Sequence, residues 1–369
     1  MDLYTLDRRF IKQDEIDAFE SAIWTERYYG DSEVQLIVPA NVNNLQKLAI
    51  GTFLGMADTD EIMMLETHDI EKGQLTIGGI SLMKWMNNRF IRDLASHETR
   101  YWNIAGYVPG HVLWLIVYYM LIQGGYPAGV GTPSEFVIPG LSLKDYDKGG
   151  SAISVAVPYG PVYDAMKSIG TTYQVGMTIT LEQADETGYS IQFRSYRGLN
   201  RTSAQTDNPV VRFSPQMESF TNIKELQSIS KYKTRVYSYA PSNPGGLASS
   251  PGFAGVSGSG TPATGFDMRA LMVFADDITT DNFGGSAASL QSLLNQRANE
   301  ALQDNTFAKY VDGELVPTSQ FKYGVHYSLG DIIEVEGNSG VTQHARITEY
   351  IRSQSEAGEK AYPTVAMIE

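Results

Sequence analysis

Histidine is the side chain in this sequence best suited to binding a metal or moving a proton near neutral pH. The chain has no cysteine and five histidines, which are His68, His97, His111, His326 and His344. No two of them have the i, i+4 spacing of a helical zinc site, and no HExxH motif occurs. A pair on neighbouring strands stays open, but isolated structural or surface histidines are the favoured interpretation. We therefore expect no metal site, no disulfide and no cysteine nucleophile.

Two pairs of aspartates are the other candidates for chemistry, Asp58 with Asp60 and Asp276 with Asp277. A glycosidase needs two carboxylates at a set separation across a cleft, whereas pairs in loops usually face solvent. The sequence has no GxSxG elbow and no GxxxxGK[ST] loop. The glycine-rich run from Gly124 lacks the preceding strand and following helix of a phosphate site. The sequence therefore predicts no catalytic residue and no cofactor.

Tryptophans could stack on sugars, and the chain has four of them. Trp85 lies in an apolar helical stripe and Trp114 in an apolar run, so both are expected in the core. Trp102, in HETRYWNIAGY, is the one whose exposure would favour a carbohydrate-binding module.

Length and charge narrow the class of protein. The 369 residues exceed what one hydrophobic core supports. The net charge of -14 disfavours stable nucleic-acid binding, which needs a basic face. The longest apolar run, Val112–Ile122, is shorter than the ~20 residues of a membrane-spanning helix. The N-terminus also lacks the basic start and apolar core of a signal peptide. We expect a folded protein of several domains with no stable membrane insertion.

The first region of the chain is expected to be β-rich. Alternating apolar residues predict a strand over Val34–Val38. Ile62–Leu65 and Leu75–Ile77 predict a hairpin around a Glu-Lys-Gly turn. Ser81 is expected to cap a helix that carries apolar residues at helical spacing as far as Phe90.

The second region mixes helices and strands. His111–Gln123 is expected to be an apolar helix, and Pro161 begins a second helix that Gly170 ends. Met177–Leu181 alternates, and Ile191–Phe193 returns as the second strand of a hairpin.

The third region is expected to be discontinuous. Val210–Phe213 and Thr234–Tyr239 predict strands, and Tyr323–Ile351 predicts a hairpin. Between them, Pro241–Gly265 is rich in Gly, Ser and Pro and is expected to be a mobile arm that orders only against another subunit. Ser286–Gln303 follows as a helix with one apolar face.

Four segments together resemble a known family. The first comprises LYTLDRRF and FESAIWTERYYGDSEVQLIVPA, and the second is MMLETHDIEKGQLTIGGISLMKWMNNRFI. The third is YSIQFRSYRGLNRT with VVRFSPQMESFTNIKELQSISKYKTRVYSY, and the last comprises RANEALQD, YGVHYSLGDIIEV and ARITEYI. In this order they are similar to the tail-tip, or baseplate hub, proteins of siphophages of Gram-positive hosts. More distantly they are similar to the central hub of contractile-tailed phages.

The resemblance implies a β-rich α+β fold with two similar antiparallel β-barrel domains and inserted α+β domains. Residues 1–92 would be the first barrel and residues 93–207 an α+β domain. Residues 208–240 and 313–369 would form the second barrel, interrupted by residues 241–312, a helical and loop domain with the Gly/Ser/Pro-rich arm.

The resemblance also implies a homotrimeric ring at the distal end of the tail tube, which adapts the sixfold tail to a threefold tip. Its partners would be the distal tail protein ring, the tape-measure protein and the tip or receptor-binding proteins, and DNA would pass through without specific binding. The protein would be made in the host bacterial cytoplasm and reside in the virion. Expected assembly residues are Phe253, Tyr323, Asp331 and Arg346.

Two departures from the family pattern bear on function. The Gly/Ser-rich loop after Pro241 looks longer than the family needs. The chain stops at Glu369, where many relatives continue into a peptidase, lysin or receptor-binding extension. We therefore expect a structural protein and no enzyme. The alternatives are a tail-associated cell-wall hydrolase and a host-wall carbohydrate-binding protein.

Overall fold

The computed structural model of the chain describes residues 1–91, 101–124, 136–185, 188–240, 252–255, 263–275, 278, 287–315, 320–338, 340 and 342–368. It divides into two compact units. Unit 1 joins Met1–Lys224 to Val311–Glu369, and unit 2 is Glu225–Tyr310. Within the described residues, no helix is both long and apolar enough to cross a membrane. The expected β-rich α+β class is confirmed.

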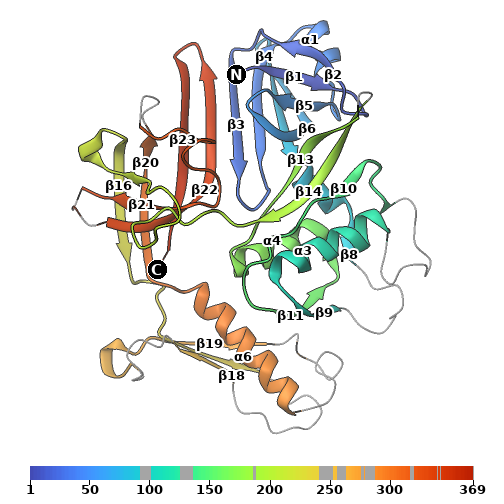
Figure 1. Cartoon of the computed structure of the whole chain (residues 1–369). Coiled ribbons are helices and arrows are strands. Elements are labelled where there is room, and N and C mark those ends of the chain that lie inside the picture. The colour runs from blue at the N-terminus through green and yellow to red at the C-terminus, as the bar shows by residue number, and fades with distance from the viewer. Residues whose placement is uncertain are drawn as a thin grey trace. The chain divides into compact units, whose positions relative to one another are not determined.

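The N-terminal part of unit 1 consists mainly of strands (Figure 1). Its elements are β1 (Leu3–Leu6), β2 (Lys12–Ile16), β3 (Ser21–Arg27), β4 (Glu33–Pro39), α1 (Val42–Lys47), β5 (Phe53–Met56), β6 (Thr59–Glu71), β7 (Gln74–Ser81), α2 (Leu82–Trp85), the 3-10 turn η1 (Met86–Asn88) and β8 (Phe90–Ile91). The expected hairpin is β6–β7. Its turn residues Lys72 and Gly73 have φ of 51° and 84°, the left-handed values that match the twist of a tight hairpin.

The helix after β7 is shorter than expected. Ser81 does cap it, because its hydroxyl accepts a hydrogen bond from the backbone N–H of Lys84. The side-chain amide of Asn88 donates to the carbonyl of Trp85 at 2.9 Å, and such local bonds compete with helix continuation. Phe90 consequently lies in strand β8 and not on the helix.

The middle of unit 1 packs two helices against a hairpin. Its elements are β9 (Tyr101–Tyr107), α3 (Pro109–Val117), the π-helical turn η2 (Tyr118–Ile122), β10 (Leu141–Leu143), β11 (Ile153–Pro158), β12 (Gly160–Pro161), α4 (Val162–Tyr173), β13 (Gly176–Asp185) and β14 (Gly188–Tyr196). Helix α4 continues past Gly170, where the sequence predicted its end, to Tyr173. A Cβ on Gly170 would lie 2.8 Å from the carbonyl oxygen of Val175. The glycine therefore permits close approach of the returning chain and does not end the helix.

The C-terminal part of unit 1 contains the predicted hairpin. Its elements are β15 (Arg212–Phe213), the 3-10 turn η4 (Pro215–Met217), β16 (Phe220–Ser228), β20 (Ala308–Leu315), β21 (Ile332–Glu336), β22 (Thr342–Ser355) and β23 (Gly358–Met367), and the unit boundaries fall inside β16 and β20. Ala345, Ile347 and Tyr350 are all buried. A register shift between Ile347 and Glu349 in the β22–β23 pair brings Tyr350 back to the same face.

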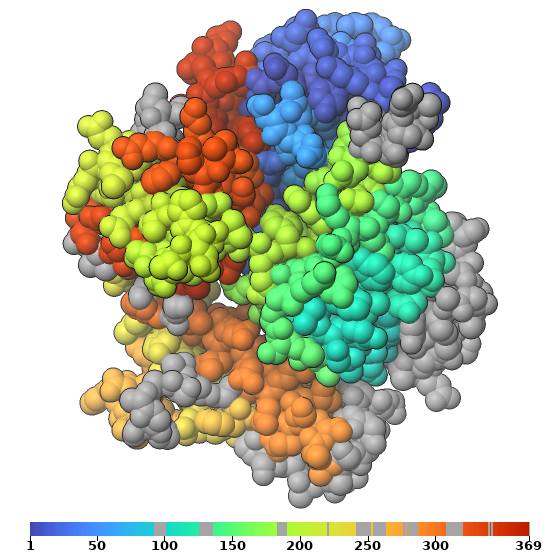
Figure 2. All heavy atoms as spheres, viewed as in Figure 1, coloured from blue at the N-terminus to red at the C-terminus, as the bar shows by residue number. Residues whose placement is uncertain are grey.

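Strands from both ends of the chain share one sheet, in which β3 pairs antiparallel with β22 and Trp24 lies opposite Arg352. Figure 2 shows the corresponding blue and red residues in contact. The N-terminal path is β3-β4-β7-β6-β5-β1-β2 and the C-terminal path is β15-β21-β22-β23. Neither path closes into a barrel among the described residues, although each region has its own cluster of buried apolar residues. The pair of similar barrels stays a prediction.

Unit 2 consists of a three-stranded sheet and a helix. Its elements are β17 (Arg235–Tyr239), β18 (Gly252–Gly255), the 3-10 turn η6 (Gly265–Asp267), β19 (Ala270–Phe274) and α6 (Ala287–Gln303). Leu290, Leu294 and Ala298 form the predicted apolar face of α6. The strand over Thr234–Tyr239 belongs to this unit, although the sequence placed it in the second barrel.

Part of the expected arm is also ordered in this unit. Gly252–Gly255 pairs antiparallel with β17. A Cβ on Gly252 would lie 2.3 Å from the backbone carbon of Leu294, so the missing side chain allows this segment to approach the helix. Most of the remaining residues of Pro241–Gly265 lie outside the described residues.

Candidate functional site

The turn between β3 and β4, Tyr28–Ser32, is where distant segments of unit 1 meet. Its own geometry is set locally. Ser32 is fully buried and its hydroxyl accepts from the backbone N–H of Arg27 at 2.9 Å, while Gly30 has φ of 84°. Because glycine adopts this left-handed conformation without strain, the chain can reverse tightly here. We call this turn, with the side chains that bind it, the junction.

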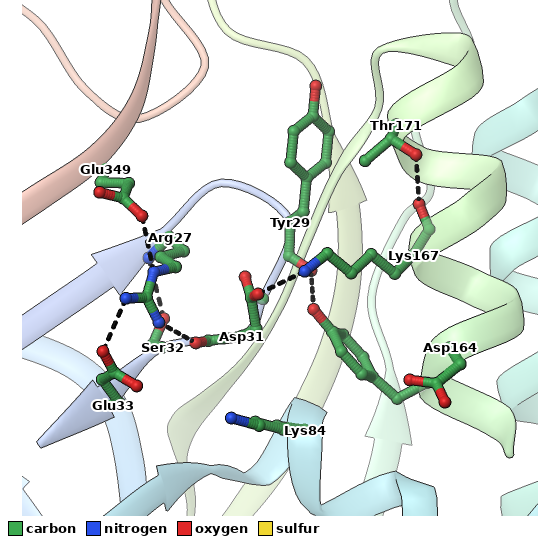
Figure 3. Close-up of polar contacts among 12 residues, drawn as sticks. Arg27, Tyr29, Asp31, Ser32, Glu33, Lys84, Asp164, Lys167, Thr171 and Glu349 are labelled. Carbon is green, nitrogen blue, oxygen red and sulfur yellow. Dashed lines mark hydrogen bonds and ion pairs between the residues drawn. The ribbon is translucent and has the colours of Figure 1, made fainter. Parts of the chain in front are cut away.

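Arg27 ties the junction to the C-terminal hairpin (Figure 3). Its guanidinium donates to Glu349 on β22 and to Glu33 on β4, at 2.7 Å each, and to the carbonyl oxygen of Asp31 at 2.7 Å. Burial alone would lower the pKa of Arg27, but the hydrogen bonds to the two carboxylates raise it above its ordinary value. The bond from Arg27 in turn lowers the pKa of Glu33. Arg27 and Glu33 are therefore both charged at neutral pH.

Helix α4 binds the same turn from the other side (Figure 3). Lys167 Nζ lies 2.5 Å from Asp31 Oδ2, and the hydroxyl of Tyr163 donates to the carbonyl oxygen of Tyr29 at 3.0 Å. Burial, together with nearby Asp31, raises the pKa of Tyr163, so this hydroxyl remains a donor. The middle part of unit 1 is therefore held to the same turn as the C-terminal hairpin.

Tyr28 is the apolar centre of the junction. The side chain is fully buried, and its hydroxyl lies 3.2 Å from the carbonyl oxygens of both Gln174 and Tyr196. The ring packs against Gly176 and Gly330, where a Cβ would lie 2.1 Å and 2.3 Å from ring carbons. These two glycines are required because the aromatic ring occupies the space of their side chains.

Asp331, at the entry to β21, forms a second buried polar centre. It is 2% exposed and accepts from Arg201 Nε at 2.6 Å and from the backbone N–H groups of Leu199 and Ser328 at 2.7 and 3.0 Å. Its neighbour Gly198 touches the Gly330–Asp331 backbone directly. Asp331 thus holds the segment after β14 against the C-terminal hairpin.

A buried acidic pair lies next to the junction. Glu26 on β3 and Glu61 on β6 are 6% and 7% exposed, and Arg352 Nη1 donates to Glu26 Oε2 at 2.6 Å. Thr59 also donates to Glu26. Burial first, and the charge of Glu26 second, raise the pKa of Glu61 well above its ordinary value. Because both carboxylates are buried, the pair does not form the open two-carboxylate cleft of a glycosidase.

The aspartate pairs, histidines and Trp102, which were the sequence candidates for chemistry or sugar binding, do not form a site among the described residues. Asp58 is exposed in the turn before β6, Asp60 is exposed at the start of β6 itself, and Asp276 and Asp277 lie outside the described residues. Among the described residues, no group of three or more His, Asp or Glu could hold a metal. Trp102 is 4% exposed, so the exposed sugar-stacking ring that would favour a carbohydrate-binding module is not found at this position.

The four expected assembly residues do not come together at one surface. Asp331 is buried as described, and Arg346 is 8% exposed and donates to the carbonyl oxygen of Gly330 at 2.9 Å. Tyr323 stacks on Tyr350 with ring centroids 3.7 Å apart. These side chains bind their own chain. Only Phe253, in unit 2, is exposed, at 45%. A role in assembly stays a prediction for all four.

The sequence alone did not identify the charged residues of the junction or the buried Glu26 beside it. A signal existed for Glu26, which shares its strand face with buried Ala22 and Trp24 because alternate residues of a strand point the same way. No local pattern identifies Arg27, whose partner Glu349 is 322 residues away.

Replacing Arg27 with alanine is expected to lower the free energy of unfolding by about 2–3 kcal/mol, because two carboxylates lose a charged hydrogen-bond donor. Lys167→Ala is the matched control. Its ion pair is partly exposed and should contribute only about 0.2–1 kcal/mol. Urea unfolding of both variants measures the difference, and equal losses would contradict the central role of Arg27.

Comparison with known proteins follows the whole length of the chain. The profile of the Siphovirus ReqiPepy6 Gp37-like protein family matches residues 1–365. No curated protein matches the chain.

Three solved structures share its fold. The prophage tail protein gp18 from Listeria monocytogenes EGD-e is 11% identical, with 100% of this chain and 95% of that chain covered and a TM-score of 0.56. The MuSo2 prophage 43 kDa tail protein from Shewanella oneidensis is 10% identical, with 99% and 97% covered and a TM-score of 0.55. The tail protein from Neisseria meningitidis MC58 is 11% identical, with 100% and 96% covered and a TM-score of 0.54.

Proposed function

This chain belongs to the Siphovirus ReqiPepy6 Gp37-like family, and on that premise we propose that it is a structural protein of the phage tail tip. The observation that carries the proposal is the shared fold with three phage tail proteins over nearly the full length of each chain. The protein would serve as a hub that forms a trimeric ring at the distal end of the tail tube. This ring would adapt the sixfold tail to a threefold tip.

The polar contacts within unit 1 support a role as a rigid structural component of the tail. Segments from the middle and end of the chain are bound to the turn of the junction, near the beginning of the chain, by two ion pairs, Arg27–Glu349 and Lys167–Asp31, and by the hydrogen bond from the Tyr28 hydroxyl to the carbonyl oxygen of Gln174. Buried, fully paired polar groups favour one rigid arrangement, since a half-satisfied network is costly. The two β-regions, each with its own apolar cluster and joined through β3 and β22, support the idea of two ring-forming domains in each chain.

The proposed partners are two further copies of the chain, the distal tail protein ring, the tape-measure protein and the tip or receptor-binding proteins. DNA would pass through the ring without specific binding, because the 42 acidic residues of the chain outnumber its 28 basic ones and the net charge of -14 disfavours contact with phosphates. The protein would act in the virion without catalysis. The buried, charge-paired state of Glu26 and the inaccessibility of Glu61 support that view.

Labelled virions provide the test of this function. A small tag on the chain should appear at the tip of the tail in particle images, and reconstruction of the tip without imposed symmetry should show three copies. Quantitative mass spectrometry of purified virions provides an independent copy number against the tail-tube protein. One or six copies per particle, or a label away from the tip, would contradict the trimeric hub.

A further inference from the structure

The two faces of the unit 2 sheet differ sharply. Helix α6 covers one of them. On that face Val236 is fully buried, and the hydroxyl of Ser238 donates to the carbonyl oxygen of Leu294 at 2.6 Å. Because side chains alternate along a strand, the intervening residues of all three strands point to the opposite side. We call that side the outer face.

The outer face is apolar and aromatic. Phe253, Met272 and Phe274 are 45%, 57% and 56% exposed, and Tyr239 is 37% exposed. Tyr237 lies between Phe253 and Met272 in the strand register, and its ring centroid is 6.0 Å from that of Phe253. Single exposed apolar residues are ordinary on protein surfaces, but a contiguous group of this kind marks an interaction site.

The charge on the outer face is positive. Arg235 lies over the ring of Phe253, with its guanidinium carbon 4.7 Å from the centroid. Lys231, Lys233 and Arg269 lie at the same end of the sheet, where β17 and β19 begin. Among the described residues none of these four cations forms an ion pair, and strands β17, β18 and β19 carry no carboxylate. One exposed carboxylate, Asp267, lies just before β19 at the same end of the sheet. The centres of protein–protein interfaces are enriched in aromatic residues, Met and Arg and depleted of Lys, Asp and Glu. The strands of the outer face have this composition.

We propose that the outer face binds an acidic surface of a second copy of this chain. The proposal rests on the proposed homo-oligomer and names the surface that would hold it together. Charge complementarity identifies the occupant, because the face is cationic in a chain whose net charge is -14. Two outer faces do not fit each other, since their cations would meet. The contact is therefore heterologous, and a heterologous contact whose rotation closes generates a ring.

The experiment uses the full-length chain in sedimentation velocity over a range of protein and salt concentrations. Wild-type protein is expected to associate with rising concentration, and more weakly at high salt. The double variant Met272→Thr with Phe274→Thr, and separately Arg235→Glu, should each weaken association by about tenfold or more, because central aromatic and Arg residues carry most interface energy. The control is Ser292→Ala with Asn299→Ala on the exposed side of α6, which should associate like wild type.

A photocrosslinking arm separates loss of binding from loss of folding. p-Benzoylphenylalanine at position 274 should crosslink two copies of the chain, and the same group at position 299 should not. If the double variant has a lower melting temperature than wild type, the Arg235→Glu variant provides the test of association. Wild-type protein that stays monomeric, variants that associate normally, or a position 274 that does not crosslink would each overturn the proposal. If virions that carry the Arg235→Glu variant still assemble with three copies of the chain, the outer face is not the contact surface, and the proposed function stands. Absence of the chain from the tail would reject the proposed function.

Discussion

Replacing Asp331 with alanine is expected to lower the free energy of unfolding of unit 1 by about 3–5 kcal/mol, because it leaves a buried positive charge without its partner. The stranded group is Arg201, whose side chain is 13% exposed and lies 2.6 Å from the carboxylate. The same substitution removes the acceptor for the backbone N–H groups of Leu199 and Ser328.

Tryptophan fluorescence during urea unfolding measures this loss directly. The four tryptophans, Trp24, Trp85, Trp102 and Trp114, all lie in unit 1, so their signal reports that unit. Asp58→Ala is the matched control, since Asp58 is an exposed carboxylate in a turn and its removal should change stability by no more than about 0.5 kcal/mol.

The double variant Asp331→Ala with Arg201→Ala should recover part of the loss, because no unpaired buried charge remains. A loss from Asp331→Ala that equals the Asp58 control would show that Asp331 is not a buried structural anchor. Asp331 would then be open to the assembly role that the sequence suggested.

Replacing Glu61 with glutamine is expected to stabilise the protein at neutral pH. Burial and the charge of Glu26 raise the pKa of Glu61 in the folded protein, whereas in the unfolded chain the carboxyl titrates near 4.5. The contribution of Glu61 to stability is fully present below about pH 4.5. It is lost as the pH rises through the folded pKa, because the unfolded state releases its proton first. Glutamine has a similar shape and cannot ionise.

The measurement is the melting temperature of both proteins at a series of pH values from acid to alkaline. Wild-type stability should fall across the window above pH 4.5, and Glu61→Gln should remove part of that slope. Other charged groups near Glu61 are Glu26, Asp31 and Arg27, and they are unchanged in both proteins. Glu66→Gln, on an exposed position of the same strand, is the control and should leave the slope unchanged. A Glu61→Gln protein that is less stable than wild type at neutral pH would contradict the raised pKa.

Local chemistry explains which parts of the fold could be predicted. The β6–β7 and β13–β14 hairpins pair residues that are close in the chain, and their alternation and turn residues are sufficient to identify them. The apolar stripe of α6 and the N-cap at Ser81 are likewise local signals. Glycine positions predicted the ends of elements less well. Gly170 and Gly252 are glycines because backbone atoms of other segments approach them closely, and neither marks a turn.

The sequence by itself determined the β-rich class, the order of the elements, the acidic character of the chain and its resemblance to tail-tip proteins. Tertiary structure alone decided that β3 pairs with β22, that Trp102 is buried, and that Asp331 and Arg346 bind their own chain. The physical reason is distance along the chain. A strand pair or buried polar contact between residues more than a hundred positions apart, as in Asp331–Arg201 and Arg346–Gln174, leaves no periodic pattern. Its members become partners only when packing removes both from water.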